Sequence, residues 1–282
     1  MSPRLLLPLV LVSFAANSLV TRYVVDRDLL DAGLLTAVRF VSGAAALLLL
    51  AAALREPVRP GRRSVVPAVW LGAYAVCISY GYLHIGAAPG TFVFYAAVLG
   101  TLVALDTRRG ERPSRRRTAG ALLALAGVGV LASSSLETVT LLGLVLLALT
   151  GAAWGLYTAA GRGAGDPRRA STENFTALAL VLAPLGLAGA AAGLPVTAEG
   201  LVWGVVMGAG TTALAYVAWY ACQPSLTGAQ AGLVQLAIPV LTTAGAVVLL
   251  DEALSVLLLV AAVLVGAGMW LGSAVPARPR PR

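Results

Sequence analysis

Ten runs of about twenty apolar residues follow one another along this chain, and they decide what it can fold into. A run of this length spans a bilayer as an α-helix. Inside the hydrocarbon every backbone polar group must be paired within the structure, so only helices and closed β-barrels can span it. A barrel needs alternating segments of about ten residues, whereas these runs are continuous and rich in Leu, Ala and Val. We therefore predict an all-α integral membrane protein with ten transmembrane helices.

The short breaks between the runs predict how neighbouring helices are arranged. The expected helices cover residues 5–23, 33–54, 65–83, 85–105, 119–135, 141–160, 175–193, 201–222, 229–250 and 254–272. Only a few residues separate some of them, as at His84 and at 251–253. Such tight joins leave no room for a soluble domain, so consecutive helices should be antiparallel.

Composition agrees with a membrane location and argues against a nucleic-acid partner. Hydrophobic residues make up 59% of the chain and charged residues 11%, against about 25% charged in soluble domains. The net charge of +8 comes entirely from arginine, because the chain has no lysine. These arginines cluster between apolar runs, which is the pattern of membrane topology, and they form no basic groove interleaved with aromatic residues. We expect the lipid bilayer, and no nucleic acid, as a partner.

The arginine distribution predicts the orientation in the membrane. With ten helices, all arginines except Arg22, Arg27 and Arg39 fall in segments on one side, or at that side's end of a helix. Arginine is retained on the cytoplasmic side of membranes. We therefore predict a multi-pass protein of the plasma membrane with both termini in the cytoplasm, including a basic tail at 275–282.

A segment half-way along the chain resembles the first predicted helix, which indicates an internal repeat. Ala15, Ala16, Leu19 and Thr21 recur 137 positions later as Ala152, Ala153, Leu156 and Thr158. A second set, Gly72, Ala73 and Tyr80, matches Gly208, Ala209 and Tyr216 at an offset of 136. We predict one five-helix repeat at 1–138 and another at 139–274. Because five is odd, the two repeats should be inverted relative to each other, which places a central cavity between them, near the midplane.

Several ordered segments resemble one transporter family. They are FAANSLVTR at 14–22, AVRFVSGAAALLLL at 37–50, GERPS at 110–114, GLVLLALTGAAWGLYTAAGR at 143–162 and QLAIPVLTTAGAVVLLDEALS at 235–255. In this order and spacing they resemble the EamA-type permeases of the drug/metabolite transporter superfamily. The resemblance implies ten helices around a central cavity that moves small organic solutes, often outward. The family's helix proline and following Glu are matched by Pro239 and Glu252, whereas the first half has no proline near Val98, so helix four should be straighter.

The function predicted from these features is transport. We expect a small-molecule substrate, such as an amino acid, exported by alternating access between the two repeats, with no cofactor, no metal and no enzymatic activity. A membrane-embedded enzyme or a non-transporting structural protein are the alternatives. One His and no Asp or Glu in the middle of any run argue against an enzyme and against a carboxylate-centred proton relay. Substrate identity, direction, ion coupling and the choice between monomer and homodimer stay open.

Arg39 is the one charged residue expected inside a helix. A charge at the centre of a membrane helix costs about 2.5–3.5 kcal/mol on insertion scales, so it usually faces a cavity or a partner. One hypothesis makes Arg39 an anchor for a substrate carboxylate or phosphate. The alternatives are that it extends to the outer surface, or that it pairs with Asp26, Asp28 or Asp31.

Six further residues are candidates to contact substrate, and one is a candidate for gating. Asn17, polar within helix one, and its repeat counterpart Trp154 are expected at the cavity, with Tyr157 three residues from Trp154 on the same face. Tyr80 and Tyr216 are the most inward members of two aromatic groups whose other role is anchoring at the membrane interface. Gln235 shares a face with Pro239, which removes a helix hydrogen bond and so suggests a kink or gate. Two acids that precede the last helix of each half, Glu111 and Glu252, are assigned to helix N-termini and not to substrate.

Overall fold

A computed structural model describes residues 3–58, 61–133, 139–249 and 253–273, which form helices joined by short turns. The α-helices are α1 (Pro3–Asp26), α2 (Ala32–Ala53), α3 (Arg62–Gly81), α4 (Ala87–Arg108), α5 (Arg115–Ala132), α6 (Leu141–Ala160), α7 (Pro167–Ala191), α8 (Ala198–Met207), α9 (Ala215–Cys222), α10 (Gly228–Gln235), α11 (Ala237–Leu249) and α12 (Val256–Ser273). Eight segments of the described chain are long and apolar enough to cross a membrane, and α12 adds a shorter apolar helix. α5, which packs along α12, occupies the remaining predicted run. The predicted all-helical membrane fold is confirmed.

Two of the ten spans are interrupted in the described part of the chain, one in a stretch with buried and exposed residues and one at the fully buried Leu236. The span Ala198–Ser225 joins α8 to α9 through a π-helical stretch, η3 (Gly208–Leu214). The span Gly228–Leu249 breaks at Leu236, between α10 and α11. By contrast α4 runs without a break, in line with the absence of a proline from its middle.

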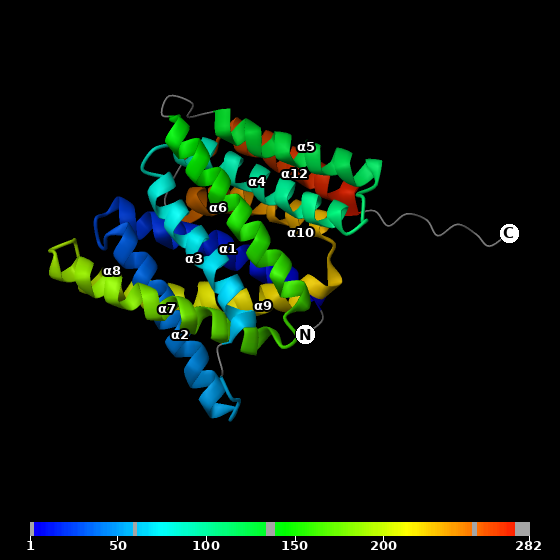
Figure 1. The fold of residues 1–282 in the computed structure, drawn as a ribbon. Coiled ribbons are helices and arrows are strands. Elements are labelled where there is room, and N and C mark those ends of the chain that lie inside the picture. The colour runs from blue at the N-terminus through cyan, green and yellow to red at the C-terminus, as the bar shows by residue number, and fades with distance from the viewer. Residues whose placement is uncertain (1–2, 59–60, 134–138, 250–252, 274–282) are drawn as a thin grey trace.

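The helices pack mainly on partners from the other half of the chain. α2 lies against α7, α5 against α12, and α4 against α10. Both α3 and α4 pack on α6, while α1 packs on α9 and α11. Figure 1 shows α5 and α12 side by side at the edge of the bundle. The core therefore depends on contacts between the halves, and neither half encloses a core of its own.

Small residues set the spacing of the α5–α12 pair. A Cβ atom at Gly268 would lie 2.5 Å from the carbonyl oxygen of Gly120 and 2.6 Å from the amide nitrogen of Ala124. Both are backbone atoms, so the two helices would have to separate. Close backbone approach through small residues is the usual way membrane helices associate, since lipid supplies no hydrophobic drive between them.

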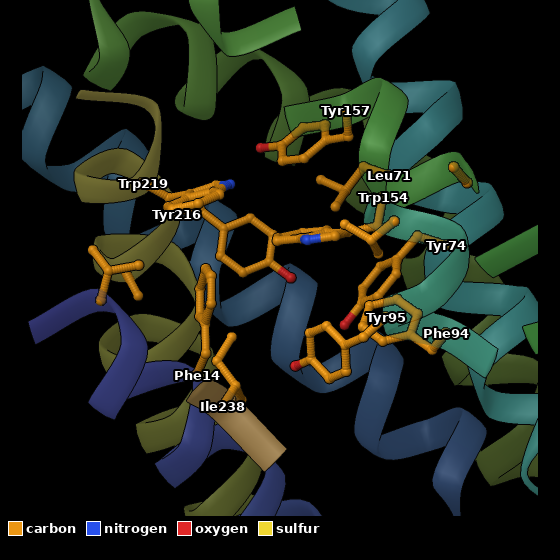
Figure 2. Close-up of a cluster of buried hydrophobic side chains, with 14 of the residues drawn as sticks. Phe14, Leu71, Tyr74, Phe94, Tyr95, Trp154, Tyr157, Tyr216, Trp219 and Ile238 are labelled. Carbon is orange, nitrogen blue, oxygen red and sulfur yellow. The ribbon is translucent and has the colours of Figure 1, made fainter. Parts of the chain in front are cut away.

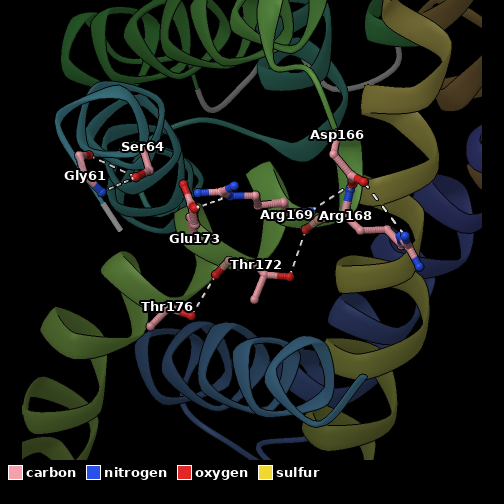
Figure 3. Close-up of polar contacts among 8 residues, drawn as sticks. All are labelled: Gly61, Ser64, Asp166, Arg168, Arg169, Thr172, Glu173 and Thr176. Carbon is pink, nitrogen blue, oxygen red and sulfur yellow. Dashed lines mark hydrogen bonds and ion pairs between the residues drawn. The ribbon is translucent and has the colours of Figure 1, made fainter. Parts of the chain in front are cut away.

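The two ends of the bundle differ in chemistry. The arginine-rich end carries the α4–α5 connection and the start of α7, where the Asp166 carboxylate accepts hydrogen bonds from the amides of Arg168 and Arg169 at 2.8 and 3.1 Å (Figure 3). At the opposite end the α1–α2 loop meets the α7–α8 loop through an isolated antiparallel bridge between Leu30 and Val196. The predicted tail 275–282, together with Arg59 and Glu252, lies outside the described residues.

We expect Gly268→Ala to destabilise the protein, because the added methyl group meets backbone on α5. Overpacking of this kind costs about 1–3 kcal/mol. Thermal unfolding of the purified protein in detergent measures the effect. Gly266→Ala, two residues away on the same helix, is the matched control, since a Cβ there meets nothing within 4 Å. Equal unfolding midpoints for the two variants would contradict the close packing.

Candidate functional site

An aromatic cluster fills the middle of the bundle. Trp154 of α6 lies at its centre, with ring centroids 5.0 Å from Tyr74, 5.1 Å from Tyr216 and 5.6 Å from Phe14. Phe14 is half-way along α1, so the cluster lies deep in the membrane. Figure 2 shows these rings converging from separate helices, with the hydroxyl groups of Tyr74, Tyr95 and Tyr216 pointing toward the middle. Edge-to-face and tilted packing of this kind adds to the area that each ring buries.

The cluster encloses a small cavity of about 50 Å³. Its lining residues come from seven helices: Phe14, Asn17, Ser18, Tyr74, Phe94, Tyr95, Trp154, Tyr216, Gln235 and Ile238. Most of the lining is aromatic, with a few amide and hydroxyl groups among the rings. Concave, largely apolar sites with a few placed polar groups are typical of small-molecule binding.

Two amide side chains supply most of the polarity. The Oε1 atom of Gln235 accepts a hydrogen bond from Trp154 Nε1 at 2.6 Å, and its Nε2 donates to the carbonyl of Ala231 at 2.8 Å. Asn17 Oδ1 accepts from the Thr212 hydroxyl at 3.0 Å. Both amides lie beside interrupted helices, Gln235 at the end of α10 and Asn17 against η3. Interrupted helices are a recurrent source of polar groups at the substrate sites of transporters.

Pro239 explains the break next to Gln235. A proline has no N–H, so the carbonyl of Gln235, four residues earlier, loses its usual helix partner. The chain turns at Leu236 with a tight bond from its amide to the carbonyl of Leu233 at 3.1 Å. Pro239 is buried in α11 and does not line the cavity, so it shapes the site through the backbone.

Arg39 is buried in α2, only 6% exposed, and its Nε atom has no hydrogen-bond partner among the described residues. Its guanidinium lies 4.8 Å from the ring centre of Phe40. Two of its predicted partners have other contacts: Asp26 is 3.9 Å from Arg22, and Asp31 caps α2 by accepting from the Gly33 and Leu34 amides. Arg39 is not among the cavity-lining residues.

Four of the residues predicted from sequence meet at the cavity: Asn17, Trp154, Tyr216 and Gln235. Tyr157 packs behind Trp154, with ring centroids 5.6 Å apart. Tyr80 was expected in the cavity, and that placement is wrong. Its side chain is 59% exposed, and Tyr74, on a different face of the same helix, takes the position instead. Tyr80 lies in the last turn of α3, which ends at Gly81, six residues beyond the cavity-lining Tyr74.

The remaining lining residues were missed by sequence reasoning. They are Phe14, Ser18, Tyr74, Phe94, Tyr95 and Ile238. The aromatic ones share a usable signal with Trp154, because each lies well inside an apolar run and not at its ends. No group of three or more His, Cys, Asp or Glu side chains that could hold a metal ion occurs within the described part of the chain.

Comparison with known proteins places this chain in a family. The model of the EamA-like transporter family matches residues 141–274. "Uncharacterized protein PA1977" of Pseudomonas aeruginosa is similar to this chain, with 38% identity over 251 residues, covering 89% of this chain and 87% of that protein. The chain belongs to the EamA-like transporter family.

A solved structure shares the fold of this EamA-like chain almost end to end. That structure, described only as "Crystal structure of protein", has a TM-score of 0.80 at 22% identity, covering 96% of this chain and 97% of the other. The shared fold includes the first half of the chain, which the family model does not reach. The protein is therefore a multi-pass membrane protein of a transporter family.

We expect Trp154→Phe to lower stability by about 1–3 kcal/mol, since it leaves the buried Gln235 oxygen without its donor. Thermal unfolding in detergent measures this. In Trp154→Phe/Gln235→Met the unpaired oxygen is also removed, and replacing both partners of a buried hydrogen bond is nearly neutral. The double variant should recover much of the loss. A double variant no more stable than Trp154→Phe would contradict the assigned role of the bond.

Proposed function

We propose that this protein exports small organic metabolites, such as amino acids, through the central cavity by alternating access. The observation that carries the proposal is the cavity itself, which lies mid-membrane and combines aromatic walls with the amides of Asn17 and Gln235. Membership of the EamA-like transporter family supplies the general activity.

The size of the cavity supports a mechanism with conformational change. Pockets for small molecules usually measure about 300–1,000 Å³, while this cavity measures about 50 Å³. A metabolite fits only if rings such as Trp154 and Tyr216 move apart. In our proposal the described conformation is closed, and solute enters when one end of the bundle opens.

The packing pattern supports two inverted five-helix repeats, at 1–138 and 139–274. The contacts of α3 and α4 with α6 have counterparts in the contacts of α9 and α11 with α1. Each of the pairs α2–α7, α5–α12 and α4–α10 joins equivalent helices of the two repeats. Inverted repeats give a transporter two related conformations that open to opposite sides. We further propose that the arginine-rich end and both termini are cytoplasmic, in the plasma membrane, on the basis of the arginine bias.

Solute flux into and out of proteoliposomes tests the proposed activity. A thermal-shift screen of the purified protein against amino acids, nucleobases, sugars and organic cations first selects solutes that raise the unfolding midpoint. We expect at least one to be transported, and Trp154→Ala to abolish its flux. Trp203→Ala, a partly exposed Trp on α8, is the matched control and should keep its flux. No binding and no flux over the whole panel would favour a structural membrane protein.

We also propose Arg39 as an anchor for a carboxylate or phosphate on the solute, because it is a buried cation with an unpaired Nε. Arg39→Gln should abolish transport of anionic solutes while the protein stays folded, and Arg39→Lys should restore part of it because the charge returns. Flux of anionic and neutral solutes, with size-exclusion profiles as the folding control, decides the point. Unchanged anion flux in Arg39→Gln would refute the anchor.

A further inference from the structure

A buried carboxylate lies at the arginine-rich end of the bundle. It directly follows the apolar run predicted at 85–105, and its burial was not predicted from sequence. Asp106, in the last turn of α4, has a side chain only 2% exposed. Its Oδ1 atom is 2.7 Å from Arg162 Nη1, just beyond the end of α6. Its Oδ2 atom accepts a hydrogen bond of 2.9 Å from the amide of Ala229 in the first turn of α10. One carboxylate thus joins three helices.

The contact with α10 requires a glycine. A Cβ atom at Gly228 would lie 2.6 Å from Asp106 Oδ1, 2.6 Å from Arg162 Nη2 and 2.7 Å from the carbonyl oxygen of Leu102. One turn later, Gly232 also lets α10 approach α4, at Leu99. The first amides of a helix have no partner within it and carry partial positive charge. The Asp106 carboxylate supplies the missing acceptor at this helix start.

α10 connects this contact directly to the cavity. The helix is eight residues long. Ala229, near its start, binds Asp106, and Gln235, at its end, binds Trp154 in the cavity wall. Beyond Gln235 the chain breaks at Leu236, so α10 can move without carrying the whole of α11 with it. Only about one and a half turns of helix separate Gln235 from Ala229. A solute that displaces Gln235 therefore also moves the Ala229 amide that binds Asp106.

We propose that Asp106, Arg162 and the first turn of α10 form the gate at the arginine-rich end of the transport pathway. While Asp106 holds both partners, this end is closed. When solute displaces Gln235, α10 shifts at the Leu236 break, the Ala229 amide leaves Asp106, and the end opens. This inference rests on the proposed transport function and names the residues that control access at one end.

The burial and hydrogen bonding of Arg162 agree with an ion pair that breaks and forms again during transport. Its Nε and Nη2 atoms are buried and have no hydrogen-bond partner among the described residues. A buried ion pair is a weak source of stability, because desolvation offsets most of the attraction. A second ion pair at this end, between Arg168 and Glu56, measures 2.6 Å but is far more exposed. The Arg168–Glu56 pair is a suitable control, because it also joins the two halves of the chain but does not contact α10.

The test measures access to the cavity from each side. In a background with Cys77→Ser and Cys222→Ala, the cavity residue Ser18 is changed to Cys and reacted with a small membrane-impermeant thiol reagent in vesicles of known orientation. We expect slow labelling from both sides in this parent. Asp106→Asn should speed labelling at least tenfold from the arginine-rich side alone. Gly228→Ala should do the same with both charges in place, because its methyl group forces α10 away from α4. Glu56→Gln should change the rate less than twofold.

Each outcome decides for or against the gate. Unchanged labelling in folded Asp106→Asn and Gly228→Ala overturns it, and so does equal acceleration from both sides, which means general loosening. Asp106→Asn/Arg162→Gln leaves no unpaired charge and replaces Asp106→Asn if that variant does not fold. The assay needs no known solute, so it separates the two proposals. If labelling is accelerated from the arginine-rich side alone but the protein transports no solute, the transport function is refuted, while the role of Asp106 in closing this end stands.

Discussion

The pairing of backbone polar groups within the membrane is the constraint on which the rest of this structure depends. Because lipid offers no hydrogen bonds, every lipid-facing stretch must be continuous helix. Two spans of the described chain depart from regular α-helix, at η3 and at Leu236. Side chains bind backbone carbonyls at both sites: the Thr211 hydroxyl donates to the Met207 carbonyl at 3.2 Å, and Gln235 Nε2 donates to the Ala231 carbonyl at 2.8 Å. The amides of Asn17, which accepts from Thr212 at 3.0 Å, and of Gln235 therefore lie beside these two sites and line the cavity.

The aromatic wall gives this polar centre a surface that can open and close. Each of the rings from Phe14, Tyr74, Trp154 and Tyr216 covers a large area with only two rotatable side-chain bonds, so a wall of them can reorganise by few rotations. In the described conformation Trp154 is 4% exposed and Tyr216 is 2% exposed. Opening the cavity breaks ring contacts and exposes hydrogen-bonding groups together, so the energy of solute binding can compensate for the contacts that are lost.

The number, order and approximate limits of the spans could be predicted from sequence, because they depend on apolar length alone. The cavity could be predicted only in part. Trp154, Gln235 and Asn17 were found because each is unusual within its own run, whereas Tyr80 was misplaced because it lies in the exposed last turn of α3, beyond the cavity-lining Tyr74. Asp106 was missed because its neighbours Arg108 and Arg109 mark a helix end facing water. Its burial comes from the close approach of α10 at Gly228, a tertiary contact that has no signature in hydropathy.

The two ends of the bundle are closed by different forces, although the repeats that we propose are related. At the arginine-rich end the contacts centre on the Asp106 carboxylate, which binds the Arg162 guanidinium and the backbone amide of Ala229 at the start of α10. At the other end backbone bonds join the loops: the Asp31 amide donates to the Pro195 carbonyl at 3.0 Å, and the Thr197 amide donates to the Leu29 carbonyl at 2.9 Å. Two identical halves would open to either side with equal ease. Here the loop contacts are between backbone groups, and the one carboxylate beside them, that of Glu199, is exposed and accepts from the Tyr23 hydroxyl at 2.9 Å. Opening the arginine-rich end instead leaves a buried carboxylate and a guanidinium to be hydrated or re-paired. In the proposed mechanism that difference makes the preference between the two open states depend on a few residues, so substitution of Asp106 would change the populations of the two states without altering the cavity that binds solute.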